Sequence, residues 1–173
     1  MIPRQGNAKN EQCRFANPSF IRLSIANEDE LCMMERLSHH NMIEYYQQHA
    51  LFWDSERHHE ILTTNDTTTI YYNDEIIGFF CLKTDINASF CWIKDLQLYP
   101  EWRNYGIGKW VLETIESTCR QQHLCWLRLC VFINSPALAL YYRHGFVLVD
   151  ENTGILRLEK QLSSSCPVNR QEK

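Results

Sequence analysis

The chain has 173 residues, of which 45% are hydrophobic and 12% aromatic, enough for one well-packed domain and short for two. Its formal net charge of −4 argues against a nucleic acid or an anionic membrane as the main partner. The sequence has no signal-peptide pattern and no apolar run long enough to span a membrane, so we expect a cytoplasmic protein.

The sequence predicts one domain between two tails. Residues 1–17 are polar and are expected to form a flexible lead, and residues 163–173 a flexible tail. Residues 18–162 contain no internal repeat and no long linker, so we expect a single domain there. The eight cysteines include no Cys-x-x-Cys pair and most lie in apolar runs, which favours mainly reduced, buried thiols.

The first part of the domain is expected to be a strand followed by helices. Alternating apolar residues predict a strand over Phe20–Ala26, and Asn27 is the expected N-cap of a helix that ends near Ser38. Apolar spacing from Met42 to His49 predicts a second helix, and Ser55–Leu62 a short third one.

Three β-prone runs follow these helices. Thr67–Tyr72 and Glu75–Lys83 flank the polar pair Asn73-Asp74, which predicts a hairpin. A further strand is predicted over Ala88–Tyr99.

The next segment predicts a crossover between two parallel strands. A polar turn, Arg103–Gly108, follows the strand Ala88–Tyr99 and precedes an amphipathic helix over Lys109–Gln122. Leu124–Ile133 is apolar except for Arg128, which is typical of a central strand buried on both faces. We therefore expect a right-handed βαβ unit.

The last elements are expected to be a helix and an antiparallel strand pair. Ser135 and Pro136 are a predicted N-cap and first helical residue, and Gly145 a predicted C-terminal residue in the left-handed conformation. Strands are predicted over Phe146–Asp150 and Ile155–Lys160. The predicted fold class is therefore α/β (α+β), with a mixed, largely antiparallel sheet and one parallel crossover.

The turn Arg103–Gly108 has the features of a phosphate-binding site. Gly106 and Gly108 allow positive φ and close approach of a ligand, and the following helix start presents unpaired N–H groups. Arg103 adds a cation suited to a pyrophosphate or a 3′-phosphate. The alternative is that the glycines only make a tight turn. Val111 and Trp110 stand where the Rossmann and P-loop motifs require glycine and Ser/Thr, so neither motif is present.

Two motifs resemble those of the GNAT superfamily of N-acetyltransferases. The run Asp95–Gly108 is similar to that family's acetyl-CoA-binding motif, in which a strand leads into Arg/Gln-x-x-Gly-x-Gly/Ala. The run Asn134–Phe146 matches every fixed position of the second signature, N-x-x-A-x-x-L-Y-x-x-x-G-F. The resemblance implies a GNAT-type sheet of six to seven strands flanked by helices, splayed between the two strands beside the cofactor.

The same resemblance implies that acetyl-CoA is the cofactor. The turn would hold its pyrophosphate, with Asn104 standing where the family commonly has glycine, and the preceding strand would make mostly main-chain contacts to pantetheine. Plain core packing is the alternative for Leu96 and Leu98, and organisation of the helix entry is the alternative for Asn134. The residues implied in cofactor binding are Leu96, Gln97, Leu98, Arg103, Asn104, Tyr105, Gly106, Ile107, Gly108, Lys109, Asn134 and Tyr141.

Two residues are candidates for the chemistry. Tyr141 matches the family tyrosine that lies near the CoA sulfur as general acid, and a buried core aromatic is the alternative. The resemblance implies a Glu or Asp base on this strand, sometimes acting through water, and Asp95 occupies a plausible position for it. A base is needed because an alkylammonium acceptor must lose a proton before attack. The alternative for Asp95 is a carboxylate that anchors a sheet edge or a loop.

The acceptor pocket is expected between the first helices and the sheet. Glu44, Tyr45, Tyr46 and Trp53 would form an acidic and aromatic lining for a cationic amine, with core packing of the aromatic residues as the alternative. No metal site is expected, because the neighbouring histidines in His39-His40 and His58-His59 point to different helix faces.

The sequence thus predicts an N-acetyltransferase that moves the acetyl group to a primary amine by direct attack in a ternary complex. The acceptor would be a small molecule, a peptide or a protein, and a homodimer is compatible with the edge strands of this fold. The alternatives are a non-catalytic acyl-CoA-binding or regulatory module and an interaction domain without cofactor.

Overall fold

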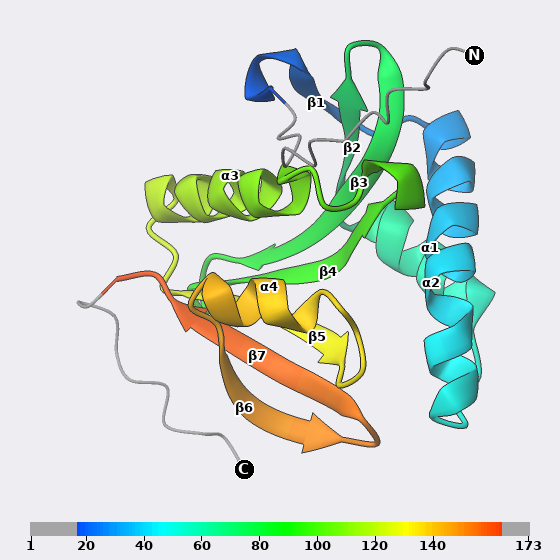
Figure 1. The fold of residues 1–173 in the computed structure, drawn as a ribbon. Coiled ribbons are helices and arrows are strands. Elements are labelled where there is room, and N and C mark those ends of the chain that lie inside the picture. The colour runs from blue at the N-terminus through cyan, green and yellow to red at the C-terminus, as the bar shows by residue number, and fades with distance from the viewer. Residues whose placement is uncertain (1–16, 164–173) are drawn as a thin grey trace, which may run out of the picture.

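The computed structural model describes residues 17–163, so the expectations for residues 1–16 and 164–173 lie outside the described part. Within it, one seven-stranded sheet has the order β1-β2-β3-β4-β5-β7-β6 (Figure 1). All neighbours are antiparallel except β4 and β5, which confirms the predicted mixed sheet with one parallel crossover. The elements are β1 (Ile21–Ile25), α1 (Glu28–Gln48), α2 (Ser55–Thr64), β2 (Asp66–Tyr72), β3 (Glu75–Asp85), β4 (Phe90–Leu98), α3 (Ile107–Gln121), β5 (Trp126–Phe132), α4 (Leu138–Arg143), β6 (Val147–Asn152) and β7 (Ile155–Gln161).

The first helix is longer than expected. Asn27 and Glu30 form a capping box at its start, as Asn27 Oδ1 accepts from the Glu30 N–H and Glu30 Oε2 accepts from the Asn27 N–H. The helix then continues through His39-His40-Asn41 to Gln48, so the predicted break near Ser38 is wrong. That segment is polar but contains no glycine or proline, and polarity alone does not end a helix.

The last helix starts later than expected. Pro136 and Ala137 form a turn and α4 begins at Leu138, so Ser135 is not its N-cap. The C-terminal end is as predicted, because Gly145 has φ +88°. The N–H groups of Gly145 and Phe146 donate to the carbonyls of Tyr142 and Tyr141, which is the Schellman arrangement.

The sheet has an apolar layer on each face. The larger one contains α3 residues such as Val111 and Ile115 together with Tyr141 of α4. The smaller one contains Met34 and Leu37 of α1 and Leu62 of α2. Figure 1 shows the corresponding arrangement, with α3 and α4 on one side of the sheet and α1 and α2 on the other. Strand β4 lies between the two layers, with Leu96 and Leu98 on the larger one and Asp95 facing α1 and α2.

The described cysteines are mainly reduced, as expected, with one exception. Cys81, Cys91 and Cys119 are buried free thiols, whereas Cys32 and Cys130 are exposed free thiols. Cys125 is disulfide-bonded, which the sequence did not predict.

None of the helices within residues 17–163 is both long and apolar enough to cross a membrane.

Strand β4 leaves no room for a side chain at Gly78 of β3. A Cβ added there would lie 2.2 Å from the Gln97 carbonyl oxygen, and this backbone atom cannot rotate away. We therefore expect Gly78→Ala to lower the free energy of unfolding by about 3 kcal/mol, measured by urea denaturation. Gly108→Ala is the control, since its Cβ would meet only the side chain of Leu140 at 3.2 Å. A Gly78→Ala protein as stable as the unsubstituted one would contradict this close approach.

Candidate active site

The central feature of the site is a gap in the sheet between β4 and β5. These strands pair only from Phe90 and Trp126 to Ile93 and Leu129. Beyond that point, within the described sheet, β4 is bonded to β3 and β5 to β7, so the facing edges of the two strands are not paired with each other. A bulge at Lys94 falls where the strands part, because Cys81 opposes Asp95 while Leu82 opposes Ile93. This confirms the expected splay and leaves two strand edges for an extended ligand.

The glycine-containing turn lies between β4 and α3. Asn104 has φ +65° and Gly106 φ +78°, so asparagine takes the left-handed conformation where the family commonly has glycine. Gly106 is the N-cap of α3, and the N–H groups of Ile107, Gly108 and Lys109 have no intrahelical acceptor. These N–H groups and the positive end of the helix dipole favour an anionic ligand.

The turn is packed against the elements that carry the other candidates. A Cβ at Gly108 would lie 3.2 Å from Leu140 Cδ2, so the start of α3 contacts the helix that carries Tyr141. The Nε and Nη2 atoms of Arg103 both donate to the Leu98 carbonyl at 3.3 Å, which anchors this cation at the end of β4. Lys109 is exposed and forms an ion pair with Glu113 at 3.6 Å.

Tyr141 is buried, with 8% of its surface exposed, and contacts the Phe146 ring edge-on at a centroid distance of 5.8 Å. Burial, and secondly the negative charge of Asp95, raise the pKa of Tyr141 well above its ordinary value. The side chain is therefore a neutral phenol that carries its proton at physiological pH.

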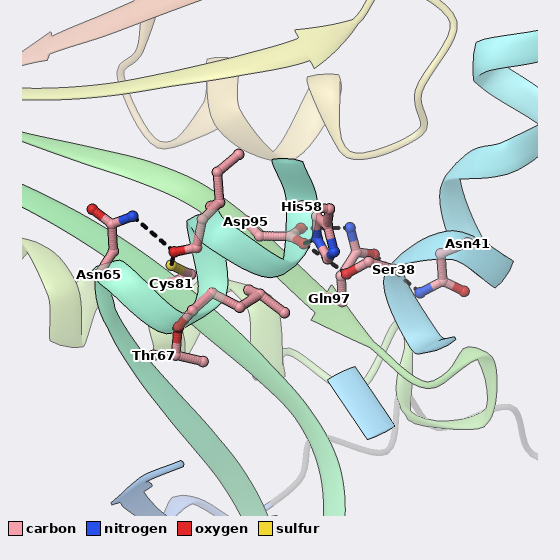
Figure 2. A network of polar contacts seen from close by, with 10 residues as sticks. Ser38, Asn41, His58, Asn65, Thr67, Cys81, Asp95 and Gln97 are labelled. Atoms are coloured by element: carbon pink, nitrogen blue, oxygen red, sulfur yellow. Dashed lines mark hydrogen bonds and ion pairs between the residues drawn. The ribbon is translucent and has the colours of Figure 1, made fainter. Parts of the chain in front are cut away.

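Asp95 lies in a polar cluster between β4 and the first two helices (Figure 2). Its Oδ2 accepts from Ser38 Oγ at 2.6 Å and contacts His58 Nε2 at 3.0 Å, and its Oδ1 accepts from Gln97 Nε2 at 2.7 Å. The side chains of Asp95 and His58 are each 12% exposed. A carboxylate has about four lone-pair positions, so three partners leave Asp95 little capacity for another proton donor.

Asn41 extends this cluster toward the glycine turn. Its Nδ2 donates to Gln97 Oε1 at 3.0 Å and to the Leu98 carbonyl at 3.2 Å. Because Arg103 donates to the same carbonyl, a continuous polar network connects the turn with Asp95. We refer to Ser38, Asn41, His58, Asp95 and Gln97 as the Asp95 network.

Three members of the Asp95 network were not predicted from the sequence, namely Ser38, Asn41 and His58. Helical spacing carried a signal for the first and the third. Ser38 lies four residues after Met34 and His58 four residues before Leu62, and both of these apolar residues are buried. His58 was considered only as a metal ligand, and its place on the apolar face of α2 was overlooked.

An aromatic cluster lies between the C-terminal part of α1, the loop that follows it and the end of β5. The ring of Tyr46 contacts those of Trp53 and Phe132 at centroid distances of 5.2 and 5.4 Å. Tyr45 and His49 stack on Phe132 at 5.6 and 5.1 Å. Burial, and secondly the charge of Asp95, raise the pKa of Tyr46.

The aromatic cluster brings together three of the four predicted acceptor residues. Tyr45, Tyr46 and Trp53 belong to it, whereas Glu44 is exposed on α1. Phe132 was missed because the apolar strand around it predicted ordinary core packing. Trp53 also contacts the His58 ring at 4.8 Å, so the aromatic cluster adjoins the Asp95 network.

The remaining predicted site residues are Leu96, Gln97 and Leu98 on β4 and Asn134 after β5. Leu96 and Leu98 pack into the larger apolar layer, while Gln97 points to the opposite face and is 8% exposed. The Asn134 side chain contacts Gln48 and His49, so it connects the end of β5 with the end of α1. Within residues 17–163, no three His, Cys, Asp or Glu side chains gather as a metal site would require.

The chain was compared with protein-family models, curated proteins and solved structures. The acetyltransferase (GNAT) family model matches residues 23–146. A sequence comparison with curated proteins finds no match. Among solved structures, PaiA N-acetyltransferase from Thermoplasma acidophilum in complex with coenzyme A is 19% identical with a TM-score of 0.66 over 82% of this chain and 98% of that one. Arabidopsis thaliana Naa50 in complex with the bisubstrate analogue CoA-Ac-MVNAL is 20% identical with a TM-score of 0.62 over the same shares.

A third structure, a GNAT family acetyltransferase from Elizabethkingia anophelis with acetyl-CoA bound, is 18% identical with a TM-score of 0.61 over 82% of this chain and 98% of that one. At these identities the structures establish a shared fold. The family match covers most of the domain and includes the splayed strands, the glycine turn and Tyr141. The chain therefore belongs to the acetyltransferase (GNAT) family.

Proposed function

We propose that this protein transfers the acetyl group of acetyl-CoA to a primary amine by direct attack in a ternary complex. The observation that carries the proposal is the gap between β4 and β5, which opens beside the glycine turn and near Tyr141. Acetyl transfer needs a donor site, a proton donor for the leaving thiolate and a proton acceptor for the amine. The described residues offer a candidate for each.

The donor site fits acetyl-CoA, which supplies the activated thioester. The start of α3 offers three N–H groups and a positive dipole to a pyrophosphate, and Arg103 adds a fixed charge nearby. The free edge of β4 from Lys94 to Leu98 offers main-chain groups to the amide-containing pantetheine arm. The related structures that contain coenzyme A or acetyl-CoA support this choice.

The candidates for the acid and the base are Tyr141 and Asp95. Tyr141 keeps its proton because burial raises its pKa, so it can donate a hydrogen bond to sulfur as negative charge develops there. Asp95, held by Ser38 and Gln97, provides the negative charge that a proton acceptor requires. The aromatic cluster offers ring faces to an alkylammonium before it loses its proton.

The acceptor is proposed as a class. Structural relatives include the Naa50 complex and a NatC complex bound to Gag peptide and CoA, which support a peptide amine, and an N-acetylglutamate synthase, which supports a small molecule. We also propose that the protein has no nucleic-acid partner, because its net charge is −4. A cytoplasmic location is a separate proposal. A homodimer is a further proposal, based on the edge strands β1 and β6.

Coenzyme A binding is the first test. At a concentration of one hundred times its Kd, CoA is expected to stabilise the protein by about 2.7 kcal/mol, measured as a shift of the melting temperature. Acetyl-CoA is then incubated with a panel of N-terminal peptides, polyamines, amino acids and aromatic amines, and free thiol is measured. Stabilisation without thiol release would favour the non-catalytic module, and absence of stabilisation would favour an interaction domain without cofactor.

A further inference from the structure

We propose that His58 is the proton acceptor of this reaction and that Asp95 is a positioning residue that orients it. The inference rests on the proposed acetyl transfer. Its first observation is that His58 Nε2 lies 3.0 Å from Asp95 Oδ2, which is an acceptor, so Nε2 carries the hydrogen. In the neutral ring the other nitrogen, Nδ1, then has a free lone pair.

The second observation is the environment of that lone pair. His58 Nδ1 is buried and has no hydrogen-bond partner in the described part of the protein. A buried acceptor without a partner is unfavourable for stability, and most buried polar atoms have one. Most buried histidines with a structural role have a partner for each nitrogen. The arrangement of His58 satisfies one nitrogen with a fixed carboxylate and keeps the other available to accept a proton.

The third observation concerns the capacity of Asp95. Ser38 and Gln97 together with His58 use three of its roughly four lone-pair positions. Asp95 therefore has little capacity for a further proton, whereas Nδ1 of His58 has a free lone pair. Asp95 stays charged, orients the ring and stabilises the imidazolium, as a buried carboxylate does for other catalytic histidines.

The position of the pair agrees with this role. Trp53 of the aromatic cluster contacts the His58 ring at 4.8 Å. The charge of Asp95 also acts on both Tyr141 and Tyr46. The His58–Asp95 pair therefore adjoins the aromatic cluster, and the charge of Asp95 reaches the candidate acid.

Each proton moved in the transfer step has its donor or its acceptor among these residues. The acceptor enters this step as the neutral amine, after its ammonium proton has passed to solvent. The amine nitrogen then forms a bond to the carbonyl carbon and loses one proton to His58 Nδ1. The bond between carbon and sulfur breaks, and the sulfur takes a proton from Tyr141. After the products leave, His58 releases its proton to solvent and Tyr141 takes one up from solvent. The net result is that the proton of the amine ends on the thiol.

The experiment compares His58→Gln with His59→Gln in the full-length protein, using the acceptor that the amine panel identifies. Glutamine keeps an N–H donor for Asp95 but cannot take up a proton. His59 is the matched control because it is the next residue of α2, is 59% exposed and pairs with Glu35. We expect His58→Gln to lower kcat at least about 100-fold and to remove the fall of the rate at acidic pH, with the CoA-induced shift unchanged. We expect His59→Gln to stay within about twofold.

Two results would overturn the proposal while acetyl transfer itself stands. One is a His58→Gln protein with kcat within about threefold of the parent and the same pH profile, since general base catalysis contributes more than that. The other uses the unsubstituted protein and so does not depend on a variant that folds. If nitrogen-15 NMR finds Nδ1 of His58 protonated at the pH of fastest transfer, it cannot be the acceptor. An unsubstituted protein that binds CoA but acetylates no amine contradicts the proposed function instead.

Discussion

Replacing Tyr141 with phenylalanine is expected to lower kcat at least about 100-fold, which corresponds to about 2.7 kcal/mol of transition-state stabilisation. Phenylalanine keeps the ring that contacts Phe146, so we expect the melting temperature and the CoA-induced shift to change little. What the variant lacks is the hydroxyl, which burial keeps protonated. The measurements are thiol release under saturating acetyl-CoA and thermal unfolding of the same preparation.

The matched control for this variant is Tyr142→Phe. Tyr142 is the next residue of α4 and is 45% exposed, so its hydroxyl is not expected to matter. The pH profile adds a second readout. The pKa of Tyr141 is raised above its ordinary value, so the side chain stays protonated below pH 10 and any loss of rate between about pH 7 and 9 must come from another group. Full turnover by the Tyr141→Phe protein would leave only the role of a core aromatic.

Replacing Gly106 with valine is expected to abolish stabilisation by CoA, a loss of about 2.7 kcal/mol at one hundred times the Kd of the parent. Gly106 has φ +78° at the N-cap of α3, a conformation that a β-branched residue rarely adopts. The turn must therefore change its backbone, and the N–H groups of Ile107 and Gly108 no longer converge on one anion. Thermal unfolding with and without CoA measures the effect.

Gly145→Val is the control that separates strain from ligand binding. Gly145 has φ +88°, and a Cβ there would meet only the Lys160 side chain at 3.6 Å or more. Both variants are therefore expected to be destabilised by about 1–2 kcal/mol, but only Gly106→Val should lose its response to CoA. A normal CoA-induced shift in Gly106→Val would mean that the pyrophosphate is bound elsewhere.

Local rules explain which secondary-structure predictions succeeded. The hairpin at Asn73-Asp74 and the Gly145 helix end follow from residues that tolerate positive φ, and the structure confirms both. The error at Ser38 arose because a polar stretch was taken for a break, whereas α1 extends past the part that it buries in the core. The sequence predicts Ser135 as the N-cap of the last helix, whereas Ala137 is the N-cap in the structure. The helix itself was predicted correctly, and only its first residue differs.

The family, the order of the strands and the glycine turn follow from the sequence alone. These depend on residues close together in the chain, namely the runs Asp95–Gly108 and Asn134–Phe146, whose conformations follow from glycine, capping and apolar spacing. The candidate acid Tyr141 and the candidate cofactor residues were named on this basis, and their roles stay predictions until the variants are measured.

Only the tertiary structure decided what surrounds Asp95. Ser38 and His58 contact it across 57 and 37 residues of sequence, and no local pattern sets such a pairing. It results from the packing of α1 and α2 on the sheet, where Met34, Leu37 and Leu62 fix the rotation of each helix. The same rotation places Tyr46 against Phe132 and leaves Glu44 exposed. Helical spacing shows which residues share a face, but only packing shows what that face meets.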